Sequence, residues 1–502
     1  MKRLLIILLG GWLLLATLPT RAQRFAETKA RNPWNLGSNA AGLRTDTLSL
    51  SYAALWAGRQ QGGLIDHSQS DRSHTAGIGT ESIRHFKRIS FAGGFHYGYF
   101  DGQNLCGSIS TRPGYWPVDI YEYTPGRKTR EEYGVRGALS ADLSPHWRIG
   151  LGADFLAGNY AKRKDLRHKN TTLDLEVMPS VMGHWGAWAV GLAYRFEKHS
   201  ERIEAEEIGS TPESYRAFFD KGLYYGVENL WTSNEIHLDE AGVSAFPIQK
   251  MIHGAALQVQ YNNLFLEADY RHTAGNTGEK GVEWHNFQGD QLLGRLVWDL
   301  YRGESRHRLW GSIRWEQSNN RELILTKQTV GGVTNTEILG EIPIFEERTL
   351  ESALHYEWHY RGSYLKAGAD YQLVRRQSSL LHPLLCEQAM RRWEVDVEGL
   401  WALNKVEILA SLFASWGSHA EWERSEGALL PESGYPMQQE QLFRWHNEYL
   451  TATRLGAELG VRITLFRGLY ADLKARYEHG FGLQYTPQPN RLETLLGLGF
   501  RW

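Results

Sequence analysis

The sequence predicts an all-β fold, a single antiparallel transmembrane β-barrel of about 18 strands with short periplasmic turns and long external loops. Three observations predict it. Segments of roughly ten residues alternate apolar with polar or small side chains, short and long connections follow one another in turn, and the chain begins with an export signal. The composition agrees, because Trp (19), Tyr (24), Phe (18) and Gly (52) are abundant while Pro (15) is scarce, which favours strands over helices.

Residues 1–22 are expected to be a secretory signal peptide. A basic start precedes an apolar run from Leu4 to about Leu18, and Ala22 suits cleavage. The run is short for a spanning helix, and no later stretch approaches about 18 consecutive apolar residues, so we predict no membrane helix. The formal net charge is -2 and no basic block stands out, so we expect no nucleic-acid partner.

The rest of the chain divides into an N-terminal segment, residues 23–45, and the barrel, residues 46–502. In "EEYGVRGALSADLSPHWRIGLGADFLAG" two amphipathic strands flank the turn "SPHW", which makes a hairpin. Seven further hairpins are predicted, with turns near Phe86, His184, Asn262, Gly303, Arg361, Asn404 and Arg467. One strand before these hairpins and one after them give an even total, so the last strand can pair with the first.

Long polar stretches separate the hairpins and are expected to be external loops. They cover residues 101–130, 199–249, 319–347, 376–391 and 417–446. Cys106 and Cys386 fall in two of them, and whether they form a disulfide stays open. A water-soluble sandwich or propeller would also have many short strands, but its connections are usually all short, and no fixed propeller period is found.

In a barrel of this size the apolar parity of each strand contacts lipid and the polar parity faces the lumen. The lumen-lining candidates are Arg136, Arg148, Asp154, Glu176, His355, Glu357, His359 and Asp370. Both charge signs occur, so the wall indicates no simple anion or cation filter. Aromatic residues near strand ends, among them Trp147, Trp188 and Trp393, are expected to form interfacial girdles.

The stretch "LHYEWHY" is the most metal-like in the chain, because His355, Glu357 and His359 share one face. The two histidines are about 13 Å apart along a strand, too far for one ion to bind both. We therefore expect no metal, and we expect no cofactor. The chain has no HExxH, GxSxG or phosphate-loop motif, so we expect no enzyme, although an integral hydrolase assembled from several strands stays open.

The chain ends "RLETLLGLGFRW", in which Leu496, Leu498, Phe500 and Trp502 share one parity. We expect this parity to contact membrane lipid and the strand to pair with the one near Thr47 to Trp56. The segment resembles the terminal signal that the barrel-assembly machinery recognises, an alternating strand that finishes on an aromatic residue. The resemblance implies that machinery as a partner.

The mature chain as a whole resembles outer-membrane β-barrel proteins common in Bacteroidota. The stretch "ARNPWNLGSNAAGL" is similar to the N-terminal segment of the long-chain fatty-acid transporter family, where that segment folds into the barrel as a small hatch. This resemblance implies the hatch candidates Asn32, Trp34, Asn35, Asn39 and Leu43. TonB-dependent receptors place a whole plug domain before a larger barrel, which does not fit the short segment before the first strand here.

These observations together predict a protein of the Gram-negative cell outer membrane with both termini in the periplasm. The leading hypothesis is a porin-like channel or transporter for an unidentified solute. A second hypothesis is a surface-binding scaffold whose long external loops hold a partner protein or glycan, such as a surface lipoprotein. The integral outer-membrane hydrolase is the third.

Overall fold

The computed structural model describes residues 32–35, 39–45, 49–164, 167–206, 215–224, 226–232, 235–236, 245–279, 282–330, 333–379, 385–419, 423–424 and 436–502. The predicted signal peptide, residues 1–22, lies outside them. Among the described residues, no helix is both long enough and apolar enough to span a membrane.

The described strands form one sheet of 22, of which 18 are long and close into a barrel, while β8, β9, β10 and β19 are short additions. The barrel strands are β1 (Leu50–Gln61), β2 (Arg72–His85), β3 (Ile89–Ser108), β4 (Asp119–Asp142), β5 (Trp147–Lys162), β6 (Arg167–Trp185), β7 (Trp188–Glu206), β11 (Ala245–Tyr261), β12 (Leu264–Glu279), β13 (Val282–Arg302), β14 (Ser305–Val330), β15 (Val333–Tyr360), β16 (Ser363–Ser379), β17 (Leu385–Leu403), β18 (Val406–His419), β20 (Thr453–Phe466), β21 (Leu469–Phe481) and β22 (Asn490–Arg501). The remaining elements are β8 (Tyr215–Asp220), β9 (Gly226–Thr232), β10 (Glu235–Ile236), β19 (Glu423–Arg424), the short helices η1 (Pro33–Asn35) and η2 (Ala40–Thr45), and the helix α3 (Pro436–Thr451).

The barrel closes where the last strand meets the first. β22 pairs antiparallel with β1 in a register that places Leu498 beside Leu55. The backbone of Trp502 both donates to and accepts from Ser51, at 3.1 and 3.0 Å. Each of the other barrel strands pairs antiparallel with its two neighbours along the chain. The predicted fold class and the predicted pairing of the terminal strand are confirmed.

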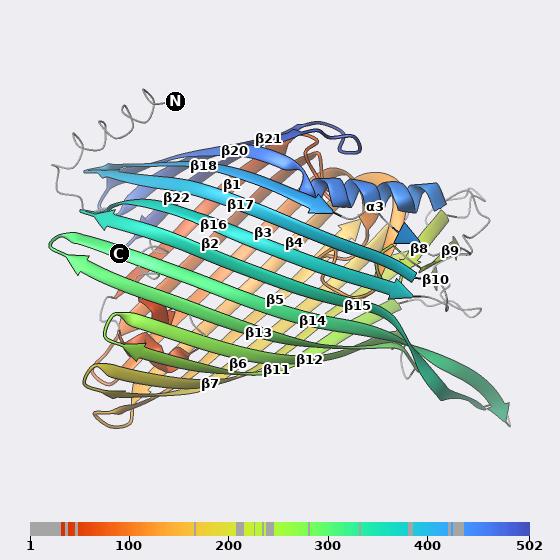
Figure 1. Cartoon of the computed structure of the whole chain (residues 1–502), viewed down its shortest axis with the longest axis horizontal. Helices are drawn as coiled ribbons and strands as arrows, with labels where there is room; N and C mark the ends of the chain where they lie inside the picture. The colour runs from red at the N-terminus through yellow and green to blue at the C-terminus, as the bar shows by residue number, and fades with distance from the viewer. Residues whose placement is uncertain are drawn as a thin grey trace.

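The two ends of the barrel differ (Figure 1). At the turn end, where the chain finishes, tight turns join the strands, and all eight predicted hairpin turns lie there. Arg361 and Gly362 have φ of 48° and 84°, and Arg467 and Gly468 have φ of 37° and 93°. Positive φ at both central residues gives a turn whose twist matches that of the flanking strands. The opposite end, here called the loop end, carries the longer connections and α3.

Large apolar side chains cover the outside of the barrel. Leu55, Leu192, Ile313, Leu412 and Leu459 are each more than half exposed, and many similar residues lie on the same strand parity. Charged and polar side chains take the other parity and face the lumen. This distribution inverts that of a water-soluble protein, in which an exposed apolar surface of this extent is rare.

Several stretches expected to be loops instead continue as strands. Residues 319–330 and 333–347 form the outer part of the β14–β15 hairpin, which projects beyond the barrel (Figure 1). Residues 199–206 and 245–249 belong to β7 and β11. The sequence did not indicate the outer β14–β15 strands, because this hairpin projects into water on both faces and its side chains show no regular apolar alternation.

Helix α3 lies in the stretch 417–446 and its continuation, where we expected a loop. Pro436 occupies its first position, which suits proline, and Gln, Glu, Leu and Arg, which follow, are good helix formers. Phe443 on this helix is fully buried against Phe218, Tyr224 and Phe345. The contact with segments more than 90 residues distant in sequence fixes the helix at the loop end.

Candidate functional site

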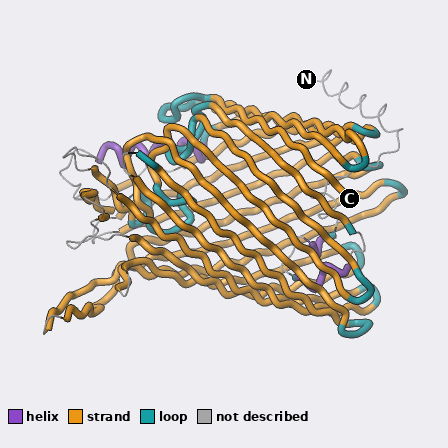
Figure 2. Tube along the Cα trace, turned by 180° about the vertical axis from the view of Figure 1, so that it is seen from behind, coloured by secondary structure: helices purple, strands orange, loops and turns teal. Residues whose placement is uncertain are grey.

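The described part of the N-terminal segment, residues 32–35 and 39–45, lies inside the barrel near the turn end, where the short helices η1 and η2 are drawn in purple (Figure 2). Trp34 is 2% exposed and packs with Met182, Phe265 and Val297 on three wall strands. Its indole N–H donates to the side-chain oxygen of Gln260. The segment is therefore held by the wall through both apolar and polar contacts.

Asn39 and Ala41 extend these contacts. The Asn39 amide donates to Gln258 Oε1 at 3.0 Å and to the Val181 carbonyl at 3.2 Å. The Ala41 N–H donates to Ser180 Oγ at 3.1 Å, and Ser140 Oγ donates to the Ala41 carbonyl at 3.0 Å. Side chains of the wall thus bind the backbone of Ala41, whose N–H also donates to Asn39 Oδ1 at 2.9 Å within the segment.

Glycine in the wall makes room for the segment. A Cβ atom placed on Gly150 would lie 2.1 Å from the Ala41 nitrogen, and one on Gly191 would lie 2.7 Å from the Trp34 ring. Real Cβ atoms do not approach other atoms so closely, so the segment could not sit here beside any larger residue.

The other hatch candidates lie in the same segment. Leu43 packs with Ile83 on β2, and the Asn32 amide donates to Thr45 Oγ1 at 2.5 Å. The backbone of Asn35 belongs to η1. All five candidates are therefore on a segment that lies within the barrel, and their role as a hatch stays a prediction.

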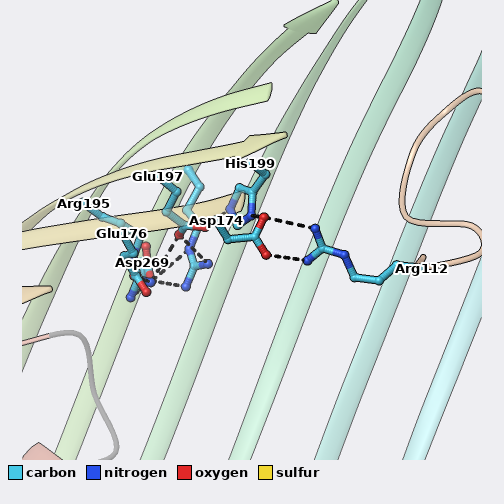
Figure 3. Close-up of polar contacts among 8 residues, drawn as sticks. Arg112, Asp174, Glu176, Arg195, Glu197, His199 and Asp269 are labelled. Atoms are coloured by element: carbon cyan, nitrogen blue, oxygen red, sulfur yellow. Dashed lines mark hydrogen bonds and ion pairs between the residues drawn. The ribbon is translucent and has the colours of Figure 1, made fainter. Parts of the chain in front are cut away.

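A second segment enters the lumen from the loop end. This inward loop, residues 109–118, joins β3 to β4. Arg112 at its tip donates to both carboxylate oxygens of Asp174 on β6, at 2.8 and 3.1 Å (Figure 3). The bidentate geometry makes this one of the stronger kinds of ion pair, and it fixes the loop in orientation as well as position.

The Arg112 contact continues into a network of charges on the wall. Asp174 also lies 2.9 Å from His199 Nδ1, and His199 Nε2 lies 2.9 Å from Glu197 on β7 (Figure 3). Arg271 on β12 contacts Glu197 at 3.4 Å and Asp269 at 2.9 Å. The inward loop is therefore attached to three wall strands and not to a single side chain.

Glu201 on β7 holds the rest of the inward loop. Its carboxylate, which is 1% exposed, accepts from Ser110 Oγ, the Thr111 N–H and the Trp116 indole N–H, at 2.9, 2.7 and 2.8 Å. Asn170 adds a fourth bond at 2.6 Å. A buried carboxylate needs such partners, so these bonds both stabilise Glu201 and position the loop.

A cap formed by β8, β9 and α3 covers the loop end. β8 pairs with the outer part of β4, where Asp119 lies beside Asp220. Apolar residues join the cap to the inward loop and the wall, among them Phe219, Phe246 and Phe287 in one cluster and Phe218, Phe345 and Phe443 in another.

Inside the barrel, bounded by the inward loop and the cap, lies a cavity of about 670 Å³. Its basic lining residues are Lys250, Arg271, Arg314, Arg376 and Arg392, and its aromatic ones include Tyr115, Trp116, Tyr121, Tyr224 and Phe287. Acidic residues alternate with them, Glu197, Glu316 and Glu347 among others. Lys250 Nζ lies 3.5 Å from the centroid of the Tyr115 ring. The cavity can offer a solute both charged partners and aromatic faces.

Asp66, His67 and His446 form a polar cluster on the cavity wall. His446 Nδ1, on α3, lies 2.7 Å from Asp66 Oδ2, and His67 Nε2 lies 3.8 Å from Asp66 Oδ1. Burial alone would raise the pKa of the Asp66 carboxyl, but His446 and His67 outweigh it and hold that pKa well below its usual range. Burial lowers the pKa of His67 to about 4, so its ring is neutral at pH 7.

Asp119 is a second perturbed group of the cap, at the loop-end start of β4 and far from the turn end. Burial raises the pKa of its carboxyl to about 7, with Asp220 and Glu201 adding to the shift. Ser108 Oγ donates to it at 2.7 Å and opposes that rise. The carboxyl is therefore about half protonated near neutral pH.

The structure separates the predicted lumen-lining residues into three groups. Near the N-terminal segment, Arg136 pairs with Glu81, Arg148 lies 3.1 Å from Asp142, and Asp154 lines a small cavity of about 150 Å³. Glu176 pairs with Arg195 in the network of Figure 3. The remaining four lie together on β15 and β16.

Within this last group, His359 Nε2 lies 2.9 Å from Glu357, and His355 lies 3.2 Å from Asp370 and 3.5 Å from Asp396. His355 also stacks on Trp310 with ring centroids 4.2 Å apart. The ligand-type atoms of His355, Asp370 and Asp396 lie within 4.8 Å of one another. Spacing along one strand could not show this grouping, because Asp370 and Asp396 come from neighbouring strands.

Sequence reasoning missed the inward loop contacts and the cluster at Asp66. Arg112 and Asp174 lie 62 positions apart, and His446 and Asp66 lie 380 apart. The parity of Asp174 and Glu197 on amphipathic strands places them in the lumen. Nothing local in the sequence pairs them with a loop residue.

A protein-family model described as "Family of unknown function (DUF6850)" matches residues 40–501. No curated protein matches the chain. Similar solved structures include a mutant of the ferric enterobactin receptor PfeA from Pseudomonas aeruginosa, with 8% identity over 91% of this chain and 81% of that chain and a TM-score of 0.40. The ferripyoverdine receptor of the same organism has 9% identity over 91% and 72%, with a TM-score of 0.37. The siderophore receptor PirA from Acinetobacter baumannii has 7% identity over 91% and 81%, with a TM-score of 0.42.

Proposed function

The chain belongs to the family of unknown function DUF6850, and we propose that it is an outer-membrane channel or transporter whose lumen is closed in this structure by its own segments. The solute stays unidentified. The proposal does not include an enzymatic activity.

The outer face of the barrel supports the membrane location. Trp147 packs on Trp185 and Trp188 on Tyr261 beside the turns, with centroids 5.2 and 4.5 Å apart. Tyr97 packs on Tyr133 about nine residues further along the strands, at 5.0 Å. Nine residues at about 3.3 Å each, tilted by about 40°, span roughly 23 Å, which matches the apolar band of about 25 Å between two aromatic girdles.

One observation supports transport more than any other. The 670 Å³ cavity lies inside the barrel, and the segments at its boundary are held by ion pairs and hydrogen bonds to the wall. Residues 110–117 of the inward loop can leave without breaking a backbone hydrogen bond to a barrel strand, because they are anchored to the wall through side chains. The described residues of the N-terminal segment lie towards the turn end and are likewise held to the wall by side-chain and packing contacts.

The orientation follows from the usual construction of such barrels, in which short turns face the periplasm and long connections face outside. We place the turn end, with Trp502, in the periplasm. The N-terminal segment then acts as the periplasmic hatch, and the cap with the inward loop closes the external side. Contact with the barrel-assembly machinery through β22 is part of the same proposal.

Solute-induced swelling of proteoliposomes tests the proposal. We expect slow entry of a disaccharide through the wild-type protein and faster entry when residues 24–45 are deleted and the inward loop is replaced by a short Gly-Ser link. The outward-facing variant Trp416→Ala serves as the control and should behave as wild type. Equal, background-level entry in all three would contradict transport.

A surface-binding scaffold is the second candidate, and the projecting β14–β15 hairpin favours it. Ile338 and Leu339 at this hairpin are 58% and 64% exposed, well beyond the barrel. Exposed apolar residues on a projecting arm suit contact with a partner such as a surface lipoprotein. Crosslinking at residue 338 in intact cells, compared with residue 412 on the barrel wall, would test this candidate separately from transport.

A further inference from the structure

The loop-end cap brings together three segments around one point in the cavity wall. Asp66 and His67 come from the β1–β2 connection, His446 comes from α3, and Tyr224 follows β8. The ligand-type atoms of Asp66, His67 and His446 lie within 4.8 Å of one another. The Tyr224 hydroxyl lies 2.6 Å from His67 Nε2 and adds an oxygen at the same point.

The surroundings orient the candidate ligand atoms. Ser68 Oγ lies 2.9 Å from His67 Nδ1, so a proton on Nδ1 leaves the Nε2 lone pair directed at the cluster. The His67 backbone N–H donates to Asp66 Oδ1 at 2.8 Å and fixes the carboxylate. A Cβ on Gly107 would lie 2.7 Å from both His67 Nδ1 and Ser68 Oγ, so glycine is needed there.

From this arrangement we propose that Asp66, His67 and His446 bind a divalent transition-metal ion of the Zn²⁺ type. Two imidazoles and one carboxylate are a common set for zinc, with a remaining position for another oxygen donor. A tetrahedral ion with bonds of about 2.0–2.2 Å keeps its ligand atoms about 3.4 Å apart, so side-chain shifts of about 1 Å complete the site. The fourth position is directed at Tyr224 and the cavity.

Bound metal joins the β1–β2 connection to α3 and so ties the cap to the barrel. In its absence the cap is held at this point by the 2.7 Å contact between His446 Nδ1 and Asp66 Oδ2, one contact in place of three metal–ligand bonds. The metal therefore stabilises the cap in its closed position over the loop end. The inference concerns the cap alone and does not depend on which solute, if any, crosses the barrel.

Zn²⁺ titration of the detergent-solubilised full-length protein, purified without a polyhistidine tag, tests the site. We expect one zinc equivalent bound with micromolar affinity, weakened at least tenfold by His446→Gln and by His67→Gln. His272→Gln is the matched control, because His272 pairs with Asp290 at 3.0 Å on the outer face and belongs to no group of three ligands among the described residues. A His355→Gln background excludes any contribution from the other histidine–carboxylate group. Retained heat-modifiable mobility shows that each barrel is folded.

A second readout follows the cap directly. Trypsin cleavage after Arg444, two residues before His446, should slow several-fold when Zn²⁺ is added to the wild type and to the control variant, but not when it is added to His446→Gln. Wild-type affinity in both His446→Gln and His67→Gln, or zinc-independent cleavage in the wild type, would overturn the inference. His446 is 19% exposed and His67 only 2%, so substitution of His446 disturbs packing less and keeps the test valid even if His67→Gln misfolds.

Discussion

Arg112 and Asp174 form a bidentate ion pair, with nitrogen–oxygen distances of 2.8 and 3.1 Å, that ties a loop at one end of the barrel to the wall of its lumen. Their side chains are 29% and 13% exposed. The pair belongs to a network with His199, Glu197 and Arg271 and is thus part of a larger attachment. The Arg112–Asp174 pair holds the inward loop in the lumen, and a single substitution can remove it.

Arg112→Ala should release the inward loop. Losing hydrogen bonds to a charged partner costs about 1.5–3 kcal/mol, which corresponds to a rise of about tenfold or more in the fraction of open molecules. Single-channel recording in planar bilayers measures that fraction. Arg127→Ala is the control, because Arg127 forms a similar pair with Asp101 but is 60% exposed, and such pairs contribute about 0–1 kcal/mol. An equal open fraction in the two variants would argue against a role of the Arg112–Asp174 pair in holding the inward loop closed.

Gly150→Ala should displace the N-terminal segment without disturbing the wall. The added Cβ would meet the Ala41 backbone at 2.1 Å, and the backbone conformation at Gly150 accepts alanine. We expect greater access of a water-soluble thiol reagent to a cysteine placed at position 41, by about tenfold. Gly98→Ala is the matched control, since its Cβ would have no atom within 4 Å. Identical labelling in both backgrounds would show that the segment does not depend on this contact.

Leu412→Arg should destabilise the barrel only if its outer face contacts lipid. Leu412 is 63% exposed on β18 and seven positions from the turn. Arginine near the middle of a bilayer costs about 2–4 kcal/mol, whereas on a water-facing surface it would cost almost nothing. Urea unfolding in lipid vesicles measures the change in the free energy of unfolding. Ser411→Arg, facing the lumen, is expected to change it by less than about 1 kcal/mol.

The pKa of Asp119 makes the cap more stable at low pH. The pKa of the carboxyl is about 7 in the folded protein and 3.8 when unfolded. The contribution of Asp119 to the stability of the cap is therefore complete below pH 3.8, falls as the pH rises and is lost above about pH 7. Hydrogen exchange at residues 217–220, corrected for the chemical exchange rate, should be slower at pH 5.5 than at 7.5. Asp119→Asn should abolish the difference, while Asp101→Asn should keep it. A pH-independent wild type would contradict the assignment.

The barrel itself could be predicted from the sequence because its signals are local. Alternation along a strand and turn residues such as Asn262, Arg361 and Arg467 depend on neighbours within a few positions. The closing pair, β1 with β22, followed from the even strand count. These features predicted the correct number of barrel strands and the correct positions of the turns.

The site could be predicted only in part, because its contacts join distant segments. The parity of Glu176 and His355 places them in the lumen, but not beside Arg195 or Asp396. The extended β14–β15 hairpin and α3 were missed because each is polar over much of its length. The segment around Trp34 was recognised by resemblance, while its partners on the wall become visible only in three dimensions.

Conductance in planar bilayers tests the proposed channel most directly. We expect the wild type to be mostly closed, and a variant lacking residues 24–45, with residues 110–117 replaced by a short Gly-Ser link, to show stable open steps. Each preparation should first show heat-modifiable mobility, so that a folded barrel is compared with a folded barrel. A folded variant that stays silent would contradict the channel and leave the scaffold as the better explanation.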